Sequence, residues 1–279
     1  MHRSSLLGAT VLVVAACVGL GAGGGARAAE RTEDVAFQAT VDGTEQRYVA
    51  IVPEAFGAGR RGPALIALHG HGSDRWQFVK EKRDECRAAR DVARAHGMLF
   101  ISPDYRAKTS WMGPAAEADL VQIIGDLRAR HGVGKVVLCG ASMGGTGVLT
   151  FTALHPDLVD GVVSLNGTAN LVEYPNFAEA IAESYGGTRE QKPLEYRQRS
   201  AEFFPERFTM PVAIATGGKD RSVPSDSTLR LAAAIAKRNR DVLVLHREQG
   251  GHSTTYDDAT AALEFVVQRL AKAKAKAKR

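Results

Sequence analysis

A stretch in the middle of the chain, residues 136–145, constrains the fold more than any other. It begins with Val-Val-Leu-Cys, an apolar and partly β-branched run typical of a strand that is covered on both faces in a parallel sheet. A Gly-x-Ser-x-Gly turn centred on Ser142 follows, and residues 146–154 can continue as a helix. Strand, tight turn and helix around a serine form a local structure that exposes the hydroxyl at the edge of a sheet. The stretch therefore predicts a parallel α/β sheet with a reactive side chain at its rim.

The remaining segments alternate between strand-like and helix-like patterns, with no internal repeat and no linker that would divide the chain. Two short strands, 35–41 and 47–52, flank the turn signal Asp42-Gly43 and predict an antiparallel N-terminal edge. The alternation beyond them predicts a mostly parallel, doubly wound sheet. Further strands are expected at 63–68, 98–102, 161–165, 211–216 and 241–246, and helices at 75–96, 115–131, 225–238 and 256–272.

Residues 168–208 interrupt this alternation. Aromatic and turn-forming residues are mixed there with one or two short helical patterns. An insert of this length in a compact domain is typically a lid or a cap beside a functional site. We therefore expect one α/β domain over residues 30–279 with a lid insertion at 168–208.

The first 29 residues have the features of an export signal. Arg3 precedes an apolar run at 6–20, and the segment ends in a small-x-small pattern at 26–28. The run is shorter than the roughly 20 residues that span a bilayer. Residues 14–17 also resemble a bacterial lipobox, which would make Cys17 a lipid anchor. Both interpretations place the mature domain outside the cytoplasm, either secreted or periplasmic in the first case and as a lipoprotein in the second.

The net charge of +5 comes from the end of the chain. The last eight residues contain four Lys and one Arg, and removing these five from 36 basic residues leaves 31, equal to the 31 acidic ones. A neutral body gives no support to nucleic-acid binding. The basic tail, 271–279, is interpreted as a solvated helix end, with binding to an anionic surface as the alternative.

Beyond the export segment the chain has two cysteines, Cys86 and Cys139. The first falls in a predicted helix and the second at the end of a predicted strand, so nothing in the sequence brings them within disulfide distance. We expect free, buried thiols. They form no Cys-x-x-Cys pair, and no metal cluster is indicated.

Two further loops follow predicted strands and carry the residue types that would activate a serine. Asp220 comes after the strand at 211–216, and His252 comes after the strand at 241–246. Because the carboxyl ends of parallel strands share one edge of the sheet, Ser142, Asp220 and His252 are expected at the same rim. Asp226, Asp257 and Asp258 are alternative carboxylates for the histidine.

Four motifs together carry a resemblance to a known family. They are His-Gly-x-Gly at 69–72, Gly-x-Ser-x-Gly at 140–144, Gly-x-x-Asp-x-x-Val-Pro at 217–224 and Gly-His at 251–252. With these motifs the chain resembles secreted α/β-hydrolases of the esterase and prolyl-oligopeptidase-like group over nearly all of residues 45–270. The resemblance implies the α/β-hydrolase fold and the chain order serine, aspartate, histidine of its catalytic triad.

The resemblance implies acyl transfer through a covalent intermediate. Ser142 would be the nucleophile, His252 the general base, and Asp220 the carboxylate that orients the histidine. The backbone N–H groups of Met143 and His71 would form the oxyanion hole. No cofactor is expected.

Three other side chains have open interpretations. His69 and His71 form a His-x-His pair, but no third metal ligand has a suitable spacing, and the oxyanion-loop interpretation is preferred. Trp111 follows the strand at 98–102 and either lines a substrate subsite or packs beneath the lid. Asn166 lies at the end of a strand and is a further candidate for substrate binding.

The leading hypothesis is a carboxylic ester hydrolase that acts on an extracellular ester, such as an acetyl or feruloyl group of a polysaccharide. The first alternative is a peptidase of the prolyl-oligopeptidase type, although too few residues precede the first strands for an N-terminal propeller. The second alternative is a catalytically inactive fold that serves as a surface binding module. The sequence does not indicate the oligomeric state, or the acyl and alcohol groups of a substrate.

Overall fold

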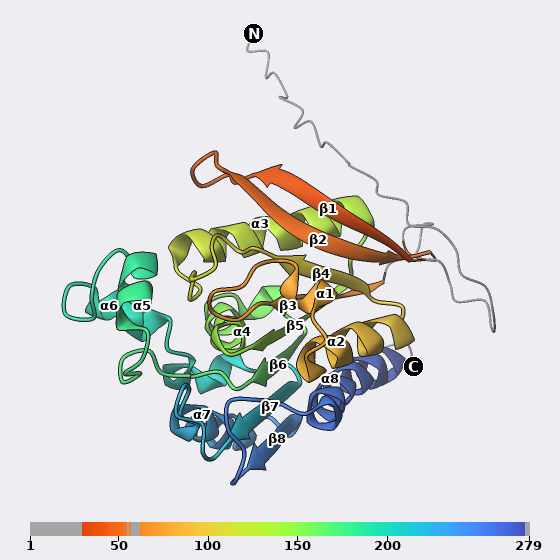
Figure 1. The fold of residues 1–279 in the computed structure, drawn as a ribbon. Helices are drawn as coiled ribbons and strands as arrows, with labels where there is room; N and C mark the ends of the chain where they lie inside the picture. Colours follow the sequence, from red (N-terminus) through yellow and green to blue (C-terminus); the bar gives the residue numbers. More distant parts are fainter. Residues whose placement is uncertain (1–29, 55, 57–61, 277–279) are drawn as a thin grey trace.

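An eight-stranded sheet forms the centre of the molecule, and helices cover both of its faces (Figure 1). The computed structural model describes residues 30–54, 56 and 62–276. The strands lie in the order β1-β2-β4-β3-β5-β6-β7-β8. Their bounds are β1 Glu30–Gln38, β2 Glu45–Pro53, β3 Pro63–Leu68, β4 Leu99–Pro103, β5 Lys135–Ala141, β6 Gly161–Leu165, β7 Val212–Gly217 and β8 Val242–Arg247.

The strand directions match the predicted fold class. β2 pairs antiparallel with both β1 and β4, and the other neighbouring strands pair parallel. The sheet is therefore mostly parallel with an antiparallel N-terminal edge, as expected. The carboxyl ends of β3, β5, β7 and β8 lie at one rim, where the loops with the candidate site residues begin.

The helices are α1 Gln77–Lys80, α2 Asp84–Ala95, α3 Pro114–His131, α4 Met143–Leu154, α5 Ala178–Tyr185, α6 Pro193–Gln198, α7 Asp226–Ala236 and α8 Tyr256–Lys276. Helices on the two faces of the sheet bury alternate residues of each central strand. Val136 and Leu138 of β5 belong to the core beneath α3, α4 and α7, whereas Val137 and Cys139 belong to the core beneath α1, α2 and α8. This alternation explains why the strand is apolar on both faces.

The helix predicted at 75–96 is wrong as one element, because the chain forms α1 and α2 with a break between them. Glu81 and Arg83 have extended backbone conformations at the break. The Arg90 side chain donates to the carbonyl oxygens of Phe78 at 2.5 Å and Glu81 at 3.0 Å. These bonds satisfy carbonyl groups that a continuous helix would have paired with backbone N–H groups.

The insert at 168–208 contains α5, α6 and two 3₁₀ turns, Ala201–Phe203 and Pro205–Arg207. Figure 1 shows α5 and α6 at one side of the molecule, beside the ends of α3 and α4. The insert is packed onto the main core, because Tyr185 and Tyr196 are buried within it. Arg199, which is 5% exposed, pairs with Glu117 of α3 at 2.7 Å and attaches the insert to the domain.

The structure describes part of the C-terminal tail but not the N-terminal export segment. The export segment 1–29, including Cys17, lies outside the described residues, so the predictions about it stay predictions. Helix α8 continues to Lys276, which makes the first part of the basic tail helical. In the part of the chain that the structure describes, no helix combines the length and apolar character needed to span a bilayer.

The cysteines Cys86 and Cys139 are free and buried. They lie in the core beneath α2 and α8. Burial raises the pKa of Cys86 to about 12 and also raises that of Cys139, so both thiols stay protonated at neutral pH.

Candidate active site

Ser142 lies in a sharp turn between β5 and α4. Its backbone angles, φ 59° and ψ −120°, are unusual for a residue with a side chain. A Cβ on Gly140 would clash with the carbonyl of Gly144, and a Cβ on Gly144 would clash with the carbonyl of Leu68 in β3. The two glycines of the motif are thus required by close backbone contacts within the turn and with the neighbouring strand.

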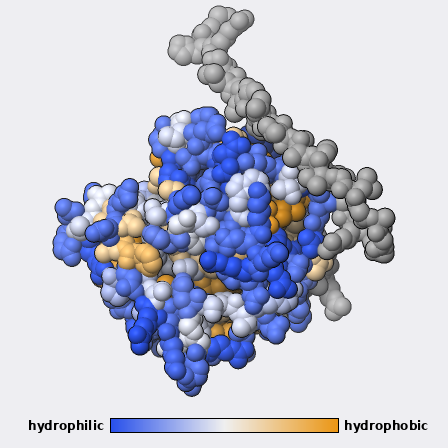
Figure 2. Space-filling view, in the orientation of Figure 1, coloured by the Kyte–Doolittle hydropathy of each residue, from blue (hydrophilic) through white to orange (hydrophobic). Residues whose placement is uncertain are grey.

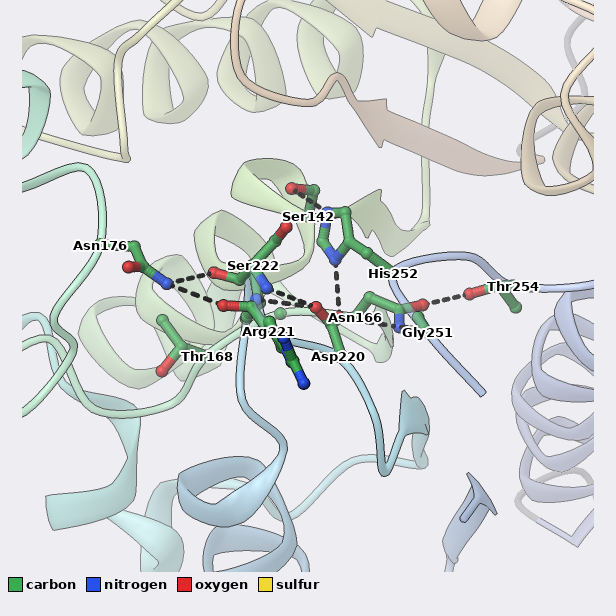
Figure 3. A network of polar contacts seen from close by, with 12 residues as sticks. Ser142, Asn166, Thr168, Asn176, Asp220, Arg221, Ser222, Gly251, His252 and Thr254 are labelled. Carbon is green, nitrogen blue, oxygen red and sulfur yellow. Dashed lines mark hydrogen bonds and ion pairs between the residues drawn. The ribbon is translucent and has the colours of Figure 1, made fainter. Parts of the chain in front are cut away.

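The structure brings the three predicted side chains together at the rim of the sheet (Figure 3). Ser142 Oγ lies 2.9 Å from His252 Nε2, and His252 Nδ1 lies 2.6 Å from Asp220 Oδ2. A carboxylate accepts hydrogen bonds only, so Nδ1 carries the proton and Nε2 is free to accept from the serine hydroxyl. The side chain of His252 is 32% exposed, whereas that of Asp220 is 1% exposed.

Asp220 is held in place by the loop that contains it. Its Oδ1 accepts the backbone N–H groups of Ser222 and Val223, each at 2.9 Å. The alternative carboxylates lie elsewhere: Asp226 and Asp257 are exposed in the first turns of α7 and α8, and Asp258 pairs with Arg247 at 2.9 Å.

Asn166 connects the aspartate and histidine loops. Its Nδ2 lies 3.3 Å from Asp220 Oδ2 and 3.4 Å from the Gly251 carbonyl, and its Oδ1 accepts from Thr254 Oγ1 at 2.5 Å. Like Ser142, it has a positive φ, 51°. The polar atoms of its side chain are therefore occupied within the protein. The sequence makes Asn166 a candidate for substrate binding, whereas these bonds favour a role in supporting the aspartate and histidine loops. Thr254 was not singled out from the sequence, and no motif marks it.

The loop after β3 lies directly against the serine. A Cβ built on Gly70 would stand 3.8 Å from the Cβ of Ser142. The loop is fixed by Gln77, whose Oε1 accepts the Gly70 N–H at 2.7 Å, and by Tyr105, whose hydroxyl donates to the His69 carbonyl at 2.6 Å. Neither residue was singled out from the sequence as part of a site.

Two backbone N–H groups beside the serine remain available as donors. The Gly70 N–H donates to Gln77, and the Gly72 N–H donates to the Lys108 carbonyl at 2.7 Å. Among the contacts of the described residues, the N–H of His71 has no acceptor. Met143 is the first residue of α4, where a helix leaves its N–H groups without internal partners. These are the two groups that the sequence predicts as oxyanion donors.

Trp111 is fully buried, so it does not line an open subsite in this structure. Its indole N–H donates to His71 Nδ1 at 3.1 Å. Its ring packs against Tyr174 and Phe177 of the insert, with ring centroids 5.7 and 5.2 Å away. The structure thus favours the packing interpretation of Trp111, with a contact to His71 in the loop after β3 that the sequence did not suggest.

A small cavity of about 40 Å³ opens beside Ser142. His252, Gln77, Arg83 and Glu85 contribute to its lining. Burial raises the pKa of Glu85. A larger apolar cavity of about 430 Å³ lies at the opposite ends of β3 and β5, among residues such as Pro63, Lys135 and Leu270. Because ligands of such sheets bind at the carboxyl ends of the strands, the small polar cavity is the one relevant to the serine.

The histidines and carboxylates of the described ranges do not gather into a group of three that could hold a metal ion. His69 is fully buried, and its ring nitrogens lie 2.8 Å from the Gly70 carbonyl and 3.1 Å from the Asp104 carbonyl. Burial lowers the pKa of both His69 and His71. The His-x-His pair is therefore divided between a structural side chain and one that contacts Trp111.

The sheet order and the serine turn define an α/β-hydrolase, and this class includes the serine hydrolases. Residues 115–273, more than half of the chain, match the prolyl oligopeptidase family. The chain belongs to this family of serine hydrolases, which confirms the resemblance to the esterase and prolyl-oligopeptidase-like group; export stays a prediction. A comparison with curated protein sequences gave no match.

Solved structures with the same fold include esterases and peptidases. An acetyl xylan esterase from Thermoanaerobacterium has a TM-score of 0.66 and 17% identity, over 92% of this chain and 87% of that one. An S-formylglutathione hydrolase from Agrobacterium tumefaciens has a TM-score of 0.66 and 14% identity, over 89% and 97%. A dipeptidyl aminopeptidase IV described as putative in its own structure report, from Bacteroides ovatus, has a TM-score of 0.67 and 16% identity. The match includes 87% of this chain but only 36% of the length of the aminopeptidase.

Proposed function

We propose that the protein is a carboxylesterase that cleaves short-chain esters through an acyl-enzyme on Ser142. The observation that carries the proposal is the unbroken hydrogen-bond chain from Ser142 Oγ to His252 to Asp220, with distances of 2.9 and 2.6 Å. A serine hydroxyl is a weak nucleophile and needs an adjacent base, and this arrangement supplies one.

In the proposed reaction, Ser142 Oγ attacks the ester carbonyl carbon while His252 Nε2 takes the hydroxyl proton. The bond to the alcohol then breaks, and His252 returns the proton to the departing oxygen. Water attacks the acyl-enzyme with His252 again acting as base, which releases the acid and restores the serine. Asp220 Oδ2 accepts the hydrogen bond from His252 Nδ1–H throughout and stabilises the imidazolium that forms in each half-reaction.

The negative charge on the carbonyl oxygen would be stabilised by the N–H groups of His71 and Met143. Both are backbone donors that need no reorganisation when the charge develops. The Met143 N–H is also at the N-terminus of α4, where the helix dipole favours negative charge.

The size of the cavity supports a short acyl group. The cavity beside Ser142 is small, about 40 Å³, so it suits a short acyl group better than a long one. The acetyl xylan esterase, which this chain covers over 87% of its length, gives further support to an acetyl ester as substrate. An exported enzyme that removes acetyl groups from polysaccharide fits the sequence of residues 1–29.

A peptidase is the second candidate, and the family match favours it. The two can be separated by comparing turnover of p-nitrophenyl acetate with turnover of aminoacyl p-nitroanilides. We expect ester turnover to exceed amide turnover, and the opposite ranking would replace the esterase by a peptidase.

The proposed nucleophile can be tested by labelling with a fluorophosphonate probe. We expect the wild-type protein to be labelled and Ser142→Ala to show neither labelling nor ester turnover, because among the described residues the hydroxyl bonded to His252 Nε2 is that of Ser142. Ser253→Ala, which removes a neighbouring hydroxyl at the same cavity, serves as the matched control and should still be labelled. Folded wild-type protein that is not labelled would favour the inactive binding module.

A further inference from the structure

Trp111 contacts both residues that supply the proposed oxyanion donors. Its indole N–H donates to His71 Nδ1 at 3.1 Å, and its backbone N–H donates to Met143 Sδ at 3.4 Å. His71 lies after β3 and Met143 begins α4, so the two are far apart in the sequence. A single residue between them can set their relative position.

The turn that contains Trp111 is itself held by the insert at 168–208. Trp111 and Met112 have positive φ angles, 41° and 54°. The Tyr185 hydroxyl donates to the Trp111 carbonyl at 3.1 Å, and Arg199 donates to the Met112 carbonyl at 2.8 Å. Such backbone conformations persist only where surrounding contacts over-determine them.

The segment 174–177 of the insert also spans the site. On one side the Tyr174 hydroxyl donates to the Ser222 carbonyl in the aspartate loop at 2.7 Å. Asn176 donates to the same carbonyl at 2.9 Å (Figure 3). On the other side the ring of Phe177 packs against His71 and Trp111, with centroids 4.5 and 5.2 Å away. Phe177 is 38% exposed, and Figure 2 shows an apolar area on the side of the molecule where the insert lies.

We propose that Trp111 is a positioning residue of the oxyanion hole, which sets the His71 and Met143 N–H groups in the arrangement that the reaction needs and is itself held by the insert. This inference rests on the proposed function. The inference gives the insert a role in catalysis. The insert holds the turn at Trp111, and Trp111 positions the residues that carry both N–H donors.

The hydrogen bond requires a neutral imidazole at His71. Only an unprotonated Nδ1 can accept the indole N–H, and burial lowers the pKa of His71, which favours that form. If Trp111 acted by packing alone, a ring of similar shape without the N–H would fill the same space and serve equally well. The hydrogen bond therefore distinguishes positioning from simple packing.

A double-mutant cycle tests the proposal in the full-length protein with p-nitrophenyl acetate. Trp111→Phe keeps an aromatic ring and removes the indole N–H, and His71→Phe keeps a ring and removes the acceptor. Loss of one oxyanion donor typically lowers kcat by about 10²–10³, so we expect a displaced donor to lower it by about tenfold or more in each variant. KM should change by less than about twofold, because the donors act on charge that develops in the transition state. The double variant should lose no more than the larger single loss.

Trp76→Phe is the matched control, because Trp76 is the other of the two tryptophans in the sequence. Its ring packs against Lys80, whose Nζ lies 3.7 Å from the ring centroid, and it is outside the site. It should leave kcat unchanged. A melting temperature for each variant separates loss of activity from loss of fold.

Wild-type kcat in Trp111→Phe, or a double variant whose loss is the product of the single losses, would overturn the inference. Should Trp111→Phe not fold, wild-type kcat in His71→Phe would overturn it as well, because that change removes the same hydrogen bond from the partly exposed partner. Failure of the proposed function is distinguishable, because in that case the wild-type protein itself shows no turnover dependent on Ser142.

Discussion

Asp220 uses both of its carboxylate oxygens for hydrogen bonds. Oδ2 faces His252 and Asn166, and Oδ1 accepts two backbone N–H groups of its own loop. One oxygen thus anchors the side chain while the other orients the histidine. An uncharged amide in this position would keep the shape and lose an acceptor.

For Asp220→Asn we therefore expect kcat on p-nitrophenyl acetate to fall by about 10³–10⁴, with a much smaller change in KM. The physical reason is that the amide favours the wrong histidine tautomer and no longer stabilises the imidazolium. Asp226→Asn, an exposed aspartate in the first turn of α7, is the control and should leave kcat unchanged. Equal activity of the two variants would mean that Asp220 does not act on His252.

At this scale the sequence predicted which side chains meet at Ser142, because each follows a buried strand and parallel strands end at one edge. It did not predict the contacts that hold those side chains. Thr254 reaches Asn166 across 88 positions, and Trp111 reaches His71 across 40. Such contacts depend on how loops cross at the rim, and hydrophobic periodicity carries no information about loop paths.

At the level of helices and strands, the start of α4 packs so closely against the end of β3 that its first turn leaves no room for a side chain at Gly144. Gly144 lies in its first turn, and a methyl group there would meet the carbonyl oxygens of Leu68 and His69. Those atoms belong to the backbone of a central strand and the loop that follows it, so they have little freedom to move.

We expect Gly144→Ala to lower the free energy of unfolding by about 1–3 kcal/mol, the usual cost of forcing extra volume into a packed site. It should also reduce ester turnover, since it displaces the start of the helix that carries the Met143 N–H. Urea titration followed by circular dichroism measures the first effect.

Gly125→Ala in α3 is the matched comparison. It is an exposed helical position, and a Cβ there would meet nothing within 4 Å. It should raise the free energy of unfolding by about 0.5–1 kcal/mol, because alanine favours the helix and restricts the unfolded chain. If both substitutions had the same effect, the close approach at Gly144 would not limit stability.

The central strands could be predicted almost to the residue because burial on both faces leaves an unmistakable apolar run, as in β3 and β6. The boundary between α1 and α2 could not be predicted from the sequence. The amphipathic pattern continues through residues 81–83, and the break is stabilised by Arg90 from the following helix. A tertiary contact there overrides local helix propensity.

For the molecule as a whole, the reactivity of the two buried cysteines shows whether the domain unfolds cooperatively. Cys86 lies in α2 and Cys139 in β5, and neither side chain is exposed. Thiol reagents attack the thiolate, and burial both hides these sulfurs and raises their pKa values, that of Cys86 to about 12.

In a Cys17→Ser background we expect neither thiol to react under native conditions, and both to become reactive in step with unfolding as urea is raised. Ellman's reagent with parallel circular dichroism makes the comparison. Thr40→Cys, on the exposed turn after β1, is the positive control and should react at once. Fast labelling that does not depend on urea would instead show that α2 opens locally without the rest of the domain.

Ser142 has a backbone conformation that costs a residue with a side chain on the order of 1–3 kcal/mol and costs glycine little. A backbone position that suits glycine is thus occupied by the hydroxyl that the proposed reaction requires. Glycine there would relieve the strain and give a more stable protein without a nucleophile. The serine at this position is therefore explained by its hydroxyl and not by a contribution to stability.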